Sequence, residues 1–115
     1  MKYCSIIIIS MFLFINSVGA EIWICKSDRY DQVKFEITDN EIIQTFPNND
    51  GRTYKITIDT REAGISVFGE MSNKERQYDF DIFMEYESKS VKVRRLDRMF
   101  GRSGSYIDKD CIIYK

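Results

Sequence analysis

The sequence predicts an all-β domain, either a small antiparallel barrel or a two-sheet sandwich of about 7–8 strands, closed by one terminal disulfide. Three observations support this. Apolar residues recur at every second position through most of the chain, and no long stretch keeps the spacing of a helix. Turn-forming residues separate these stretches at short intervals. Two of the cysteines, Cys25 and Cys111, lie near the two ends of the domain.

Residues 1–20 have the layout of a secretory signal peptide. Lys2 gives a basic start, an apolar run extends from Ile6 to Ile15, and Val18-Gly19-Ala20 forms a small-residue cleavage site. The apolar run has half of the roughly 20 residues that a membrane span needs. We therefore expect cleavage after Ala20, a single all-β domain over residues 21–115, and a periplasmic or extracellular location. We expect no stable membrane insertion of the mature protein.

The mature domain is small and slightly acidic. One of the 17 basic residues, Lys2, lies in the leader, so 16 basic and 18 acidic residues remain, a net charge of −2. A chain of this size buries only about two-thirds of its unfolded surface, so a covalent link adds useful stability. Cys25 and Cys111 form an even pair in an oxidising compartment and are expected to form a disulfide. Because this link brings the first and last strands together, it favours a closed barrel.

The expected strands follow from the period-two alternation, which is typical of strands with one face in the core. Turns are predicted at Asp39-Asn40 and at 47–51, where proline, asparagine and glycine gather. On the strand that follows the second of these turns, Tyr54, Ile56 and Ile58 are predicted to face inward. Besides the hairpin described next, the expected strands are Ile22–Cys25, Val33–Thr38, Ile42–Phe46, Tyr54–Asp59, Ile65–Phe68 and Cys111–Tyr114.

The strongest local prediction is a hairpin that begins at Tyr78. The nine residues from Tyr78 to Tyr86 alternate almost strictly, which leaves little room for a helix. A turn at Ser88-Lys89 then sets the register of the hairpin. The predicted pairs are Tyr86 with Val91, Glu85 with Lys92, Met84 with Val93, and Phe83 with Arg94, whose guanidinium would lie over the ring. A β-bulge after Arg94 is predicted to bring Leu96 to the core face.

The composition argues against most enzyme chemistries. There is no histidine, which excludes Ser-His-Asp triads, histidine metal ligands and histidine pH switches. The segment 101–105 looks like a nucleophile elbow, but Gly104 stands one place too early. Asp79 and Asp81 share a strand face, whereas a calcium ion needs six or more oxygen ligands. We therefore expect no catalysis, no cofactor and no metal site; an enzyme built on a carboxylate pair is the last-ranked alternative.

Charge is unevenly distributed between neighbouring strands. Basic residues cluster from Lys89 to Arg102, and acidic residues precede them from Asp79 to Glu87. Most of these charges are expected to pair across the strands. Past the acidic strand, Met99–Lys109 is predicted to be a glycine-containing loop with exposed cations and apolar anchors, typical of recognition loops. The candidate partner-binding residues are Arg98, Phe100, Arg102, Ser103, Ser105 and Lys109.

The layout resembles that of small exported bacterial β proteins. Trp23-Ile24-Cys25 opens the mature domain, and Cys111 lies in the last expected strand. The C-type lysozyme inhibitors of the periplasm belong to this group, and the resemblance implies an eight-stranded barrel with a single terminal disulfide. Ser103-Gly104-Ser105-Tyr106 is loosely similar to the Ser-Gly-rich inhibitory loop of that family. The likeness is one of layout.

Two functions follow from these features. The first is a monomeric, non-catalytic binding or inhibitor module of the cell envelope, whose partner is a protein or an anionic envelope polymer. Nucleic acid is not expected as a partner, because the protein is expected to be exported and its net charge is negative. The alternative is a calycin-like carrier of a small apolar ligand. Bulky inward residues such as Phe35, Tyr54 and Phe80 argue for a filled interior instead.

Overall fold

The computed structural model describes residues 21–115, which form eight antiparallel strands. The expected signal peptide lies outside the described residues. The strands are β1 (Glu21–Lys26), β2 (Gln32–Ile37), β3 (Glu41–Thr45), β4 (Gly51–Asp59), β5 (Ser66–Asn73), β6 (Tyr78–Glu85), β7 (Ser90–Asp97) and β8 (Arg102–Tyr114). Each strand pairs with the next, and β8 pairs with β1, so the sheet closes into a barrel. The predicted all-β class is confirmed, and the architecture is the barrel.

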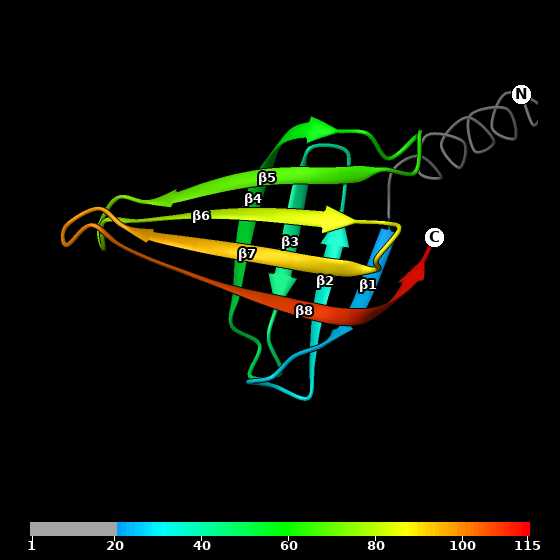
Figure 1. Ribbon diagram of the computed structural model, residues 1–115, viewed down its shortest axis with the longest axis horizontal. Helices are drawn as coiled ribbons and strands as arrows, with labels where there is room; N and C mark the ends of the chain where they lie inside the picture. The colour runs from blue at the N-terminus through cyan, green and yellow to red at the C-terminus, as the bar shows by residue number, and fades with distance from the viewer. Residues whose placement is uncertain (1–20) are drawn as a thin grey trace, which may run out of the picture.

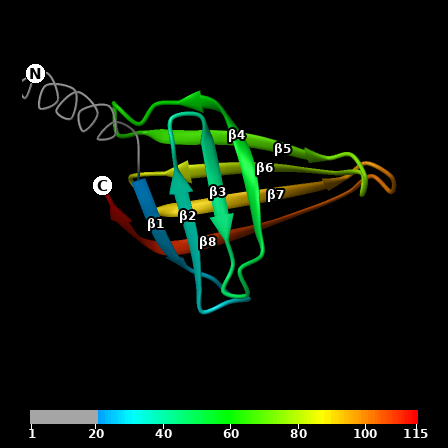
Figure 2. The same ribbon diagram turned by 180° about the vertical axis from the view of Figure 1, so that it is seen from behind.

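The barrel has two halves whose strands cross. In Figure 1, β5–β8 run along the long axis of the view and β1–β4 run across them. Figure 2 shows the same arrangement from behind, with β1–β4 in front. The far ends of β5–β8 continue past the crossing strands and finish in two turns, at 74–77 and 98–101. We call this projection, residues 71–79 and 95–105, the arm.

Side chains fill the interior of the barrel. Trp23, Phe35, Tyr54, Ile82 and Met84 have no exposed surface and come from four different strands. The alternation read from the sequence places them inward, because successive side chains of a strand point to opposite faces. Burial of each large side chain contributes about 1.5–3 kcal/mol. The described residues therefore form a filled interior, as the bulky inward side chains predicted.

One buried polar network lies among these apolar side chains. The Tyr54 hydroxyl donates a hydrogen bond of 2.6 Å to the side-chain oxygen of Gln44. The Gln44 amide nitrogen in turn donates to the Tyr106 hydroxyl at 3.0 Å, and Arg52 donates to the same hydroxyl at 3.2 Å. Burial raises the pKa of Tyr54 strongly, although Arg52 opposes this shift. The network links β3, β4 and β8 across the barrel and ends at a half-buried arginine.

A disulfide joins Cys25 of β1 to Cys111 of β8, as predicted. The pairing of these two strands shifts by one residue between Ile24 and Lys26, and Asp110 adopts a φ of 53° at that point. This β-bulge lets β8 bend from β7 toward β1 and complete the barrel. A disulfide fits an oxidising compartment. Among the residues described, no helix is long and apolar enough to cross a membrane.

The inward orientation predicted for Ile58 is wrong. Tyr54 is buried and Ile56 packs against the core, but Ile58 is exposed. The pairing of β4 with β5 shifts between Ile56 and Ile58, so that Ile58 stands opposite Phe68. A β-bulge inserts one residue and moves every later side chain to the other face. The bulge also marks where β4 stops pairing with β3 and pairs with β5 alone.

The predicted β6–β7 hairpin exists, but its register is wrong by two residues. Glu85 pairs with Ser90 and Met84 with Val91, and Tyr86 begins a turn at 86–89. A shift of two residues keeps the inward face unchanged, so alternation alone could not reveal it. The consequence falls on the outer face. Its pairs are Phe83 with Lys92 and Asp81 with Arg94, in place of Glu85 with Lys92 and Phe83 with Arg94.

Two further predictions along β7 and β8 are wrong. The register of β6 and β7 runs without a shift from Glu85 to Tyr78, so there is no bulge after Arg94, and Leu96 stays on the outer face. The expected loop 99–109 is mostly strand, because β8 begins at Arg102. Only 98–101 forms a turn. Both β7 and β8 extend along the arm, beyond the barrel core, because their backbones pair with each other there.

Candidate functional site

The end of the arm is a rigidly built turn that exposes two apolar side chains. A side-chain oxygen of Asp97 accepts hydrogen bonds from the backbone nitrogens of Met99 at 3.0 Å and Phe100 at 3.3 Å. Gly101 donates its backbone N–H to the Asp97 carbonyl at 2.8 Å and has a φ of 65°, which glycine adopts easily. Met99 is 67% exposed and Phe100 68%. We call residues 98–101 the tip.

Arg98 holds the two turns of the arm together. Its backbone nitrogen donates to the Gln77 carbonyl at 2.9 Å, and its guanidinium donates to the Asn73 carbonyl at 3.2 Å. The guanidinium also forms an ion pair with Asp79, with an N–O distance of 3.4 Å. These bonds tie the tip to the neighbouring turn at 74–77. The side chain of Arg98, predicted to contact a partner, is therefore engaged within the protein.

The structure separates the six predicted site residues into three places. Arg98 and Phe100 lie in the tip, and Arg102 begins β8. Ser103 and Ser105 follow on β8, on the opposite face from Arg102 because strand side chains alternate. Lys109 pairs with Lys26 at the far end of β8. Seven residues of extended strand put it about 23 Å from Arg102, so it does not belong to the same site.

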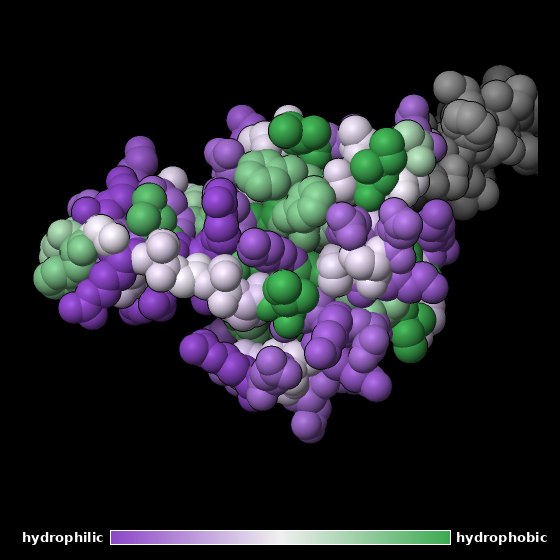
Figure 3. Space-filling view, viewed as in Figure 1, coloured by the Kyte–Doolittle hydropathy of each residue, from purple (hydrophilic) through white to green (hydrophobic). Residues whose placement is uncertain are grey.

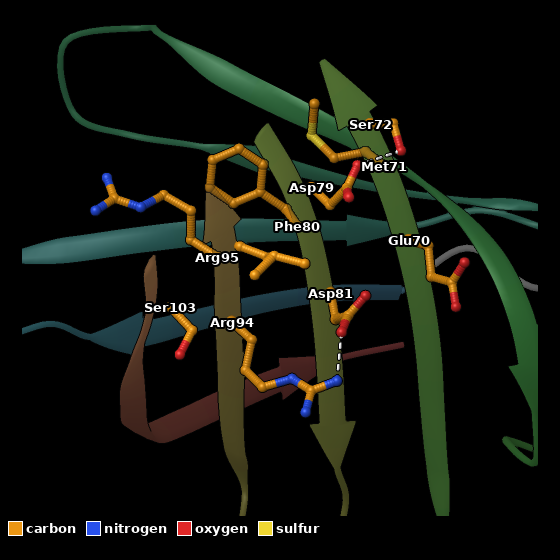
Figure 4. A pocket seen from close by; sticks show the side chains of 10 residues that line it. Glu70, Met71, Ser72, Asp79, Phe80, Asp81, Arg94, Arg95 and Ser103 are labelled. Carbon is orange, nitrogen blue, oxygen red and sulfur yellow. Dashed lines mark hydrogen bonds and ion pairs between the residues drawn. The ribbon is translucent and has the colours of Figure 1, made fainter. Parts of the chain in front are cut away.

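The outer surface at the base of the arm is an open hollow lined by both acidic and basic side chains (Figure 4). The hollow has a volume of about 460 Å³. In it, Arg94 forms an ion pair with Asp81, and the Ser72 hydroxyl donates to Asp79 at 2.7 Å. Figure 4 shows Arg94 turned toward Asp81. Both carboxylates considered as calcium ligands therefore have protein partners, and no group of three or more metal-ligating residues occurs within 21–115.

The inner surface of the arm, on the side of the barrel interior, carries arginines that form no close ion pair. Three arginines lie there, Arg52 beside the arm on β4, Arg95 on β7 and Arg102 on β8. None of them takes part in the ion pairs found within residues 21–115, which are Arg61–Asp59, Arg94–Asp81 and Arg98–Asp79. Each is instead placed over an aromatic ring. We call this surface, formed by Arg52, Tyr78, Phe80, Arg95, Asp97, Arg102 and Gly104, the inner face.

Sequence reasoning missed Arg52 and Arg95 as site residues. The predicted bulge after Arg94 moves Arg95 away from the core face. Arg52 follows the predicted turn at 47–51, and no other basic residue lies in or next to that turn to mark a site. The signal that could have found Arg95 is the unbroken alternation of β7, which puts it on the same face as Val93. Burying an unpaired charge is costly. A cation at a core-facing position of a strand therefore indicates that the closed core ends there.

A row of apolar side chains crosses the outer surface of the barrel itself. Ile58, Phe68, Phe83 and Ile107 lie on successive paired strands, with Lys92 between the last two. Figure 3 shows apolar side chains gathered over the middle of this surface, surrounded by polar ones. Three of the four, Ile58, Phe83 and Ile107, are among the exposed large hydrophobic residues. A shallow hollow of about 250 Å³ lies beside Phe83 and Phe68.

A buried carboxylate lies near the turn between β1 and β2. Asp108 is 1% exposed, and its Oδ2 atom has no hydrogen-bond partner among the described residues. Burial raises the pKa of Asp108, a hydrogen bond from Ser27 opposes the rise, and the nearby Asp28 adds to it. Together with Tyr30 and other neighbours it lines a hollow of about 30 Å³. That volume is the share of one water molecule in the liquid.

Comparison with known proteins assigns no relative to this chain. No protein-family model matches it, and neither a curated protein nor a solved structure matches. The functional argument therefore rests on the residues and geometry described above.

Proposed function

We propose that this protein is a non-catalytic binding or inhibitor module of the exported compartment, and that the tip of the arm is its contact with a partner protein. The observation that carries the proposal is the tip itself. It projects beyond the barrel and exposes Met99 and Phe100 by about two-thirds each. Exposed apolar and aromatic side chains on a rigid support are typical anchors of protein interfaces.

Two further features support binding at the surface. The hydrogen bonds of Asp97 and Arg98 fix the tip before any partner arrives, and a fixed contact loses less conformational entropy on binding than a mobile one. The interior of the barrel is occupied by the protein's own side chains. A filled interior supports a surface function over the carrier alternative.

Site-specific photocross-linking tests the proposal. A benzophenone side chain at position 100 is expected to cross-link one partner protein in the native cell envelope, because the tip enters that partner. Ile112 is the matched control position, since it is 58% exposed and lies on the barrel away from the arm. Equal cross-linking of the same protein from positions 100 and 112 would argue against a contact at the tip.

A double variant tests the energetic role of the tip. Met99→Ser with Phe100→Ser removes both apolar anchors, and the affinity for the cross-linked partner is expected to fall by about tenfold or more. Both side chains are exposed, so the thermal unfolding midpoint should stay within a few degrees of the original. Unchanged affinity in a folded double variant would contradict the proposal.

A further inference from the structure

The outward side chains of β5–β8 form one surface whose charges are sorted by strand, and we call this surface the outer face. Its charged residues are all acidic on β5 and β6 and all basic on β7 and β8. They are Glu70, Asp79, Asp81 and Glu85 on the acidic half, and Lys92, Arg94 and Lys109 on the basic half. The ion pair of Asp81 with Arg94 lies at the boundary, between β6 and β7.

Two of these charges have no opposite charge beside them on the neighbouring strands. Glu85 stands between two serines in the strand pairing, and Lys92 stands between Phe83 and Ile107. Neither Glu85 nor Lys92 takes part in the ion pairs found within residues 21–115. The acidic half and the basic half each keep a charge that is open to another molecule.

The apolar row described above crosses both halves of the outer face at the level of Lys92. Ile58 is 59% exposed and Ile107 53%, and Phe83 lies between them in the row. Figure 3 shows these apolar side chains in the middle of the surface, with polar side chains around them. An exposed apolar patch with a polar rim is typical of a protein–protein interface.

The sorting of charge makes the outer face complementary to a copy of itself. When two copies meet face to face, a two-fold axis parallel to the strands and between β6 and β7 places the acidic half of each copy on the basic half of the other. A two-fold axis across the strands would place acidic on acidic and basic on basic. Because like charges repel across an interface, the charges favour the axis along the strands.

This axis brings together residues that stand at the same level on the outer face. The β7 strand of one copy lies over β6 of the other, so Lys92 lies over Phe83 of the second copy. On β6, Asp81 and Glu85 flank Phe83, two residues away on either side. The ammonium group of Lys92 therefore meets a surface with carboxylates, and the apolar row is covered by the apolar row of the second copy.

We propose that the outer face is the interface of a symmetric homodimer, in which β6 of each subunit packs on β7 of the other. The proposal differs from the monomer expected from the sequence. It goes beyond the proposed function, because it lies on a different surface from the tip and needs no other protein. Four strands and six residues of rise give the face an extent of about 20 by 20 Å. Interfaces of this size are small, so we expect a dimer that dissociates in the micromolar range.

Sedimentation equilibrium of the purified exported protein tests the proposal. A dimer is expected to form as the concentration rises, and a protein that stays monomeric up to about 1 mM would overturn the proposal. Ile107→Glu places an acidic group opposite the acidic half of the second copy and is expected to raise the dissociation constant about tenfold or more. Ile112→Glu is the matched control, because Ile112 is as exposed but pairs with β1. Equal losses in both variants would also overturn the proposal.

A mixing experiment tests the arrangement of the two subunits. Glu85→Lys and Lys92→Glu each place like charges together at both copies of the contact, so each variant alone is expected to dimerise about tenfold more weakly. An equal mixture of the two is expected to form a heterodimer, because opposite charges then meet at both copies of the contact. Lys34→Glu, at an exposed position on β2, changes the net charge as Lys92→Glu does.

The control mixture is Glu85→Lys with Lys34→Glu, which has the same net charges without the restored contacts. It is expected to associate more weakly than the mixture of Glu85→Lys with Lys92→Glu. Equal association of the two mixtures would show attraction between net charges alone and would overturn the proposal. The Met99→Ser and Phe100→Ser double variant is expected to dimerise as the original protein does, so failure at the tip and failure at the outer face are distinguishable.

The proposed axis also fixes where the two tips lie. Because the axis is parallel to β5–β8, both arms point the same way and both tips lie at one end of the dimer. An axis across the strands would separate the tips by about 40 Å, twice the run of six residues from Lys92 to the tip. Spin labels at position 99 measure this separation by pulsed electron paramagnetic resonance. A shorter distance is expected, and one of about 40 Å or more would overturn the arrangement.

Discussion

At the scale of single residues, Asp108 lies in an environment that opposes its charge. The carboxylate is buried, its Oδ2 has no partner among the described residues, and Asp28 is close enough to repel it. The hydrogen bond from Ser27 offsets only part of this cost, because the pKa remains raised. A raised carboxyl pKa means that the folded state holds a proton more tightly than the unfolded chain does. Asp108 therefore destabilises the fold progressively as the pH rises from its unfolded pKa to its folded pKa.

The variant Asp108→Asn is expected to be more stable than the original protein at pH 7, by about 1–3 kcal/mol, because an uncompensated buried charge is removed. The gain should be small near pH 4, where the carboxyl group is protonated in the folded state. It should grow as the pH rises through the folded pKa and then level off. Urea unfolding of the variant and of the original protein at several pH values measures this gain in stability. A gain that is the same at pH 4 and pH 7 would show that ionisation of Asp108 is not its source.

At the scale of elements, the turns and bulges decide which strand residues meet. The turn between β6 and β7 ends at Lys89, whose φ of 50° lies in the left-handed region. The Lys89 carbonyl accepts a hydrogen bond from the Cys111 nitrogen at 3.0 Å, which holds the residue in that conformation. This four-residue turn, in place of the two-residue turn expected from Ser88-Lys89, shifts the hairpin register by two. A lysine in this conformation costs free energy that glycine would not.

The variant Lys89→Gly is expected to stabilise the protein by about 0.5–1 kcal/mol, since the relief of left-handed strain exceeds the added entropy of the unfolded glycine. Ser88→Gly is the matched control. Ser88 does not have a positive φ, so its replacement adds entropy to the unfolded chain without relieving strain and should destabilise the protein. Thermal or urea unfolding of the two variants measures the difference. Destabilisation by both would contradict the argument.

At the scale of the whole molecule, the two ends of the domain are tied to each other and to the β6–β7 turn. The disulfide links β1 to β8 over a separation of 86 residues. Close to it along β1, Glu21 accepts hydrogen bonds from the Tyr86 hydroxyl at 2.7 and 2.9 Å. The Trp23 ring packs edge-on against that of Tyr86, with centres 5.1 Å apart. Closure of the barrel therefore depends on contacts between residues that are far apart in the sequence.

Replacing both cysteines, as Cys25→Ala with Cys111→Ala, is expected to lower the free energy of unfolding by about 4–5 kcal/mol. A link that closes a loop of this length removes much entropy from the unfolded chain. Urea unfolding of the double variant and of the original protein measures the change. The original protein unfolded with a reducing agent present should lose a similar amount. An unchanged unfolding midpoint in both experiments would show that the disulfide contributes no stability.

The candidate site was predictable in part. Composition and turn chemistry pointed to the region around Phe100 and Arg102, and both lie at the end of the arm. The inner face was not predictable, because Arg52 and Arg95 come together only where β4 crosses the end of the closed core. Contacts within the protein also removed one of the predicted partner-binding residues. Arg98 is engaged with Asp79 and Asn73, contacts that depend on the neighbouring hairpin.

The sequence by itself determined the all-β class, the disulfide and the inward face of most strands, because a period of two and the positions of cysteines are local properties. Only the tertiary structure decided the register of β6 and β7, the bulge that turns Ile58 outward, and the strand at 102–109. A register shift of two residues leaves the inward pattern intact, and a bulge depends on which strands must meet to close the barrel. For the same reason, only the closed fold separated the arginines that have carboxylate partners from those that do not.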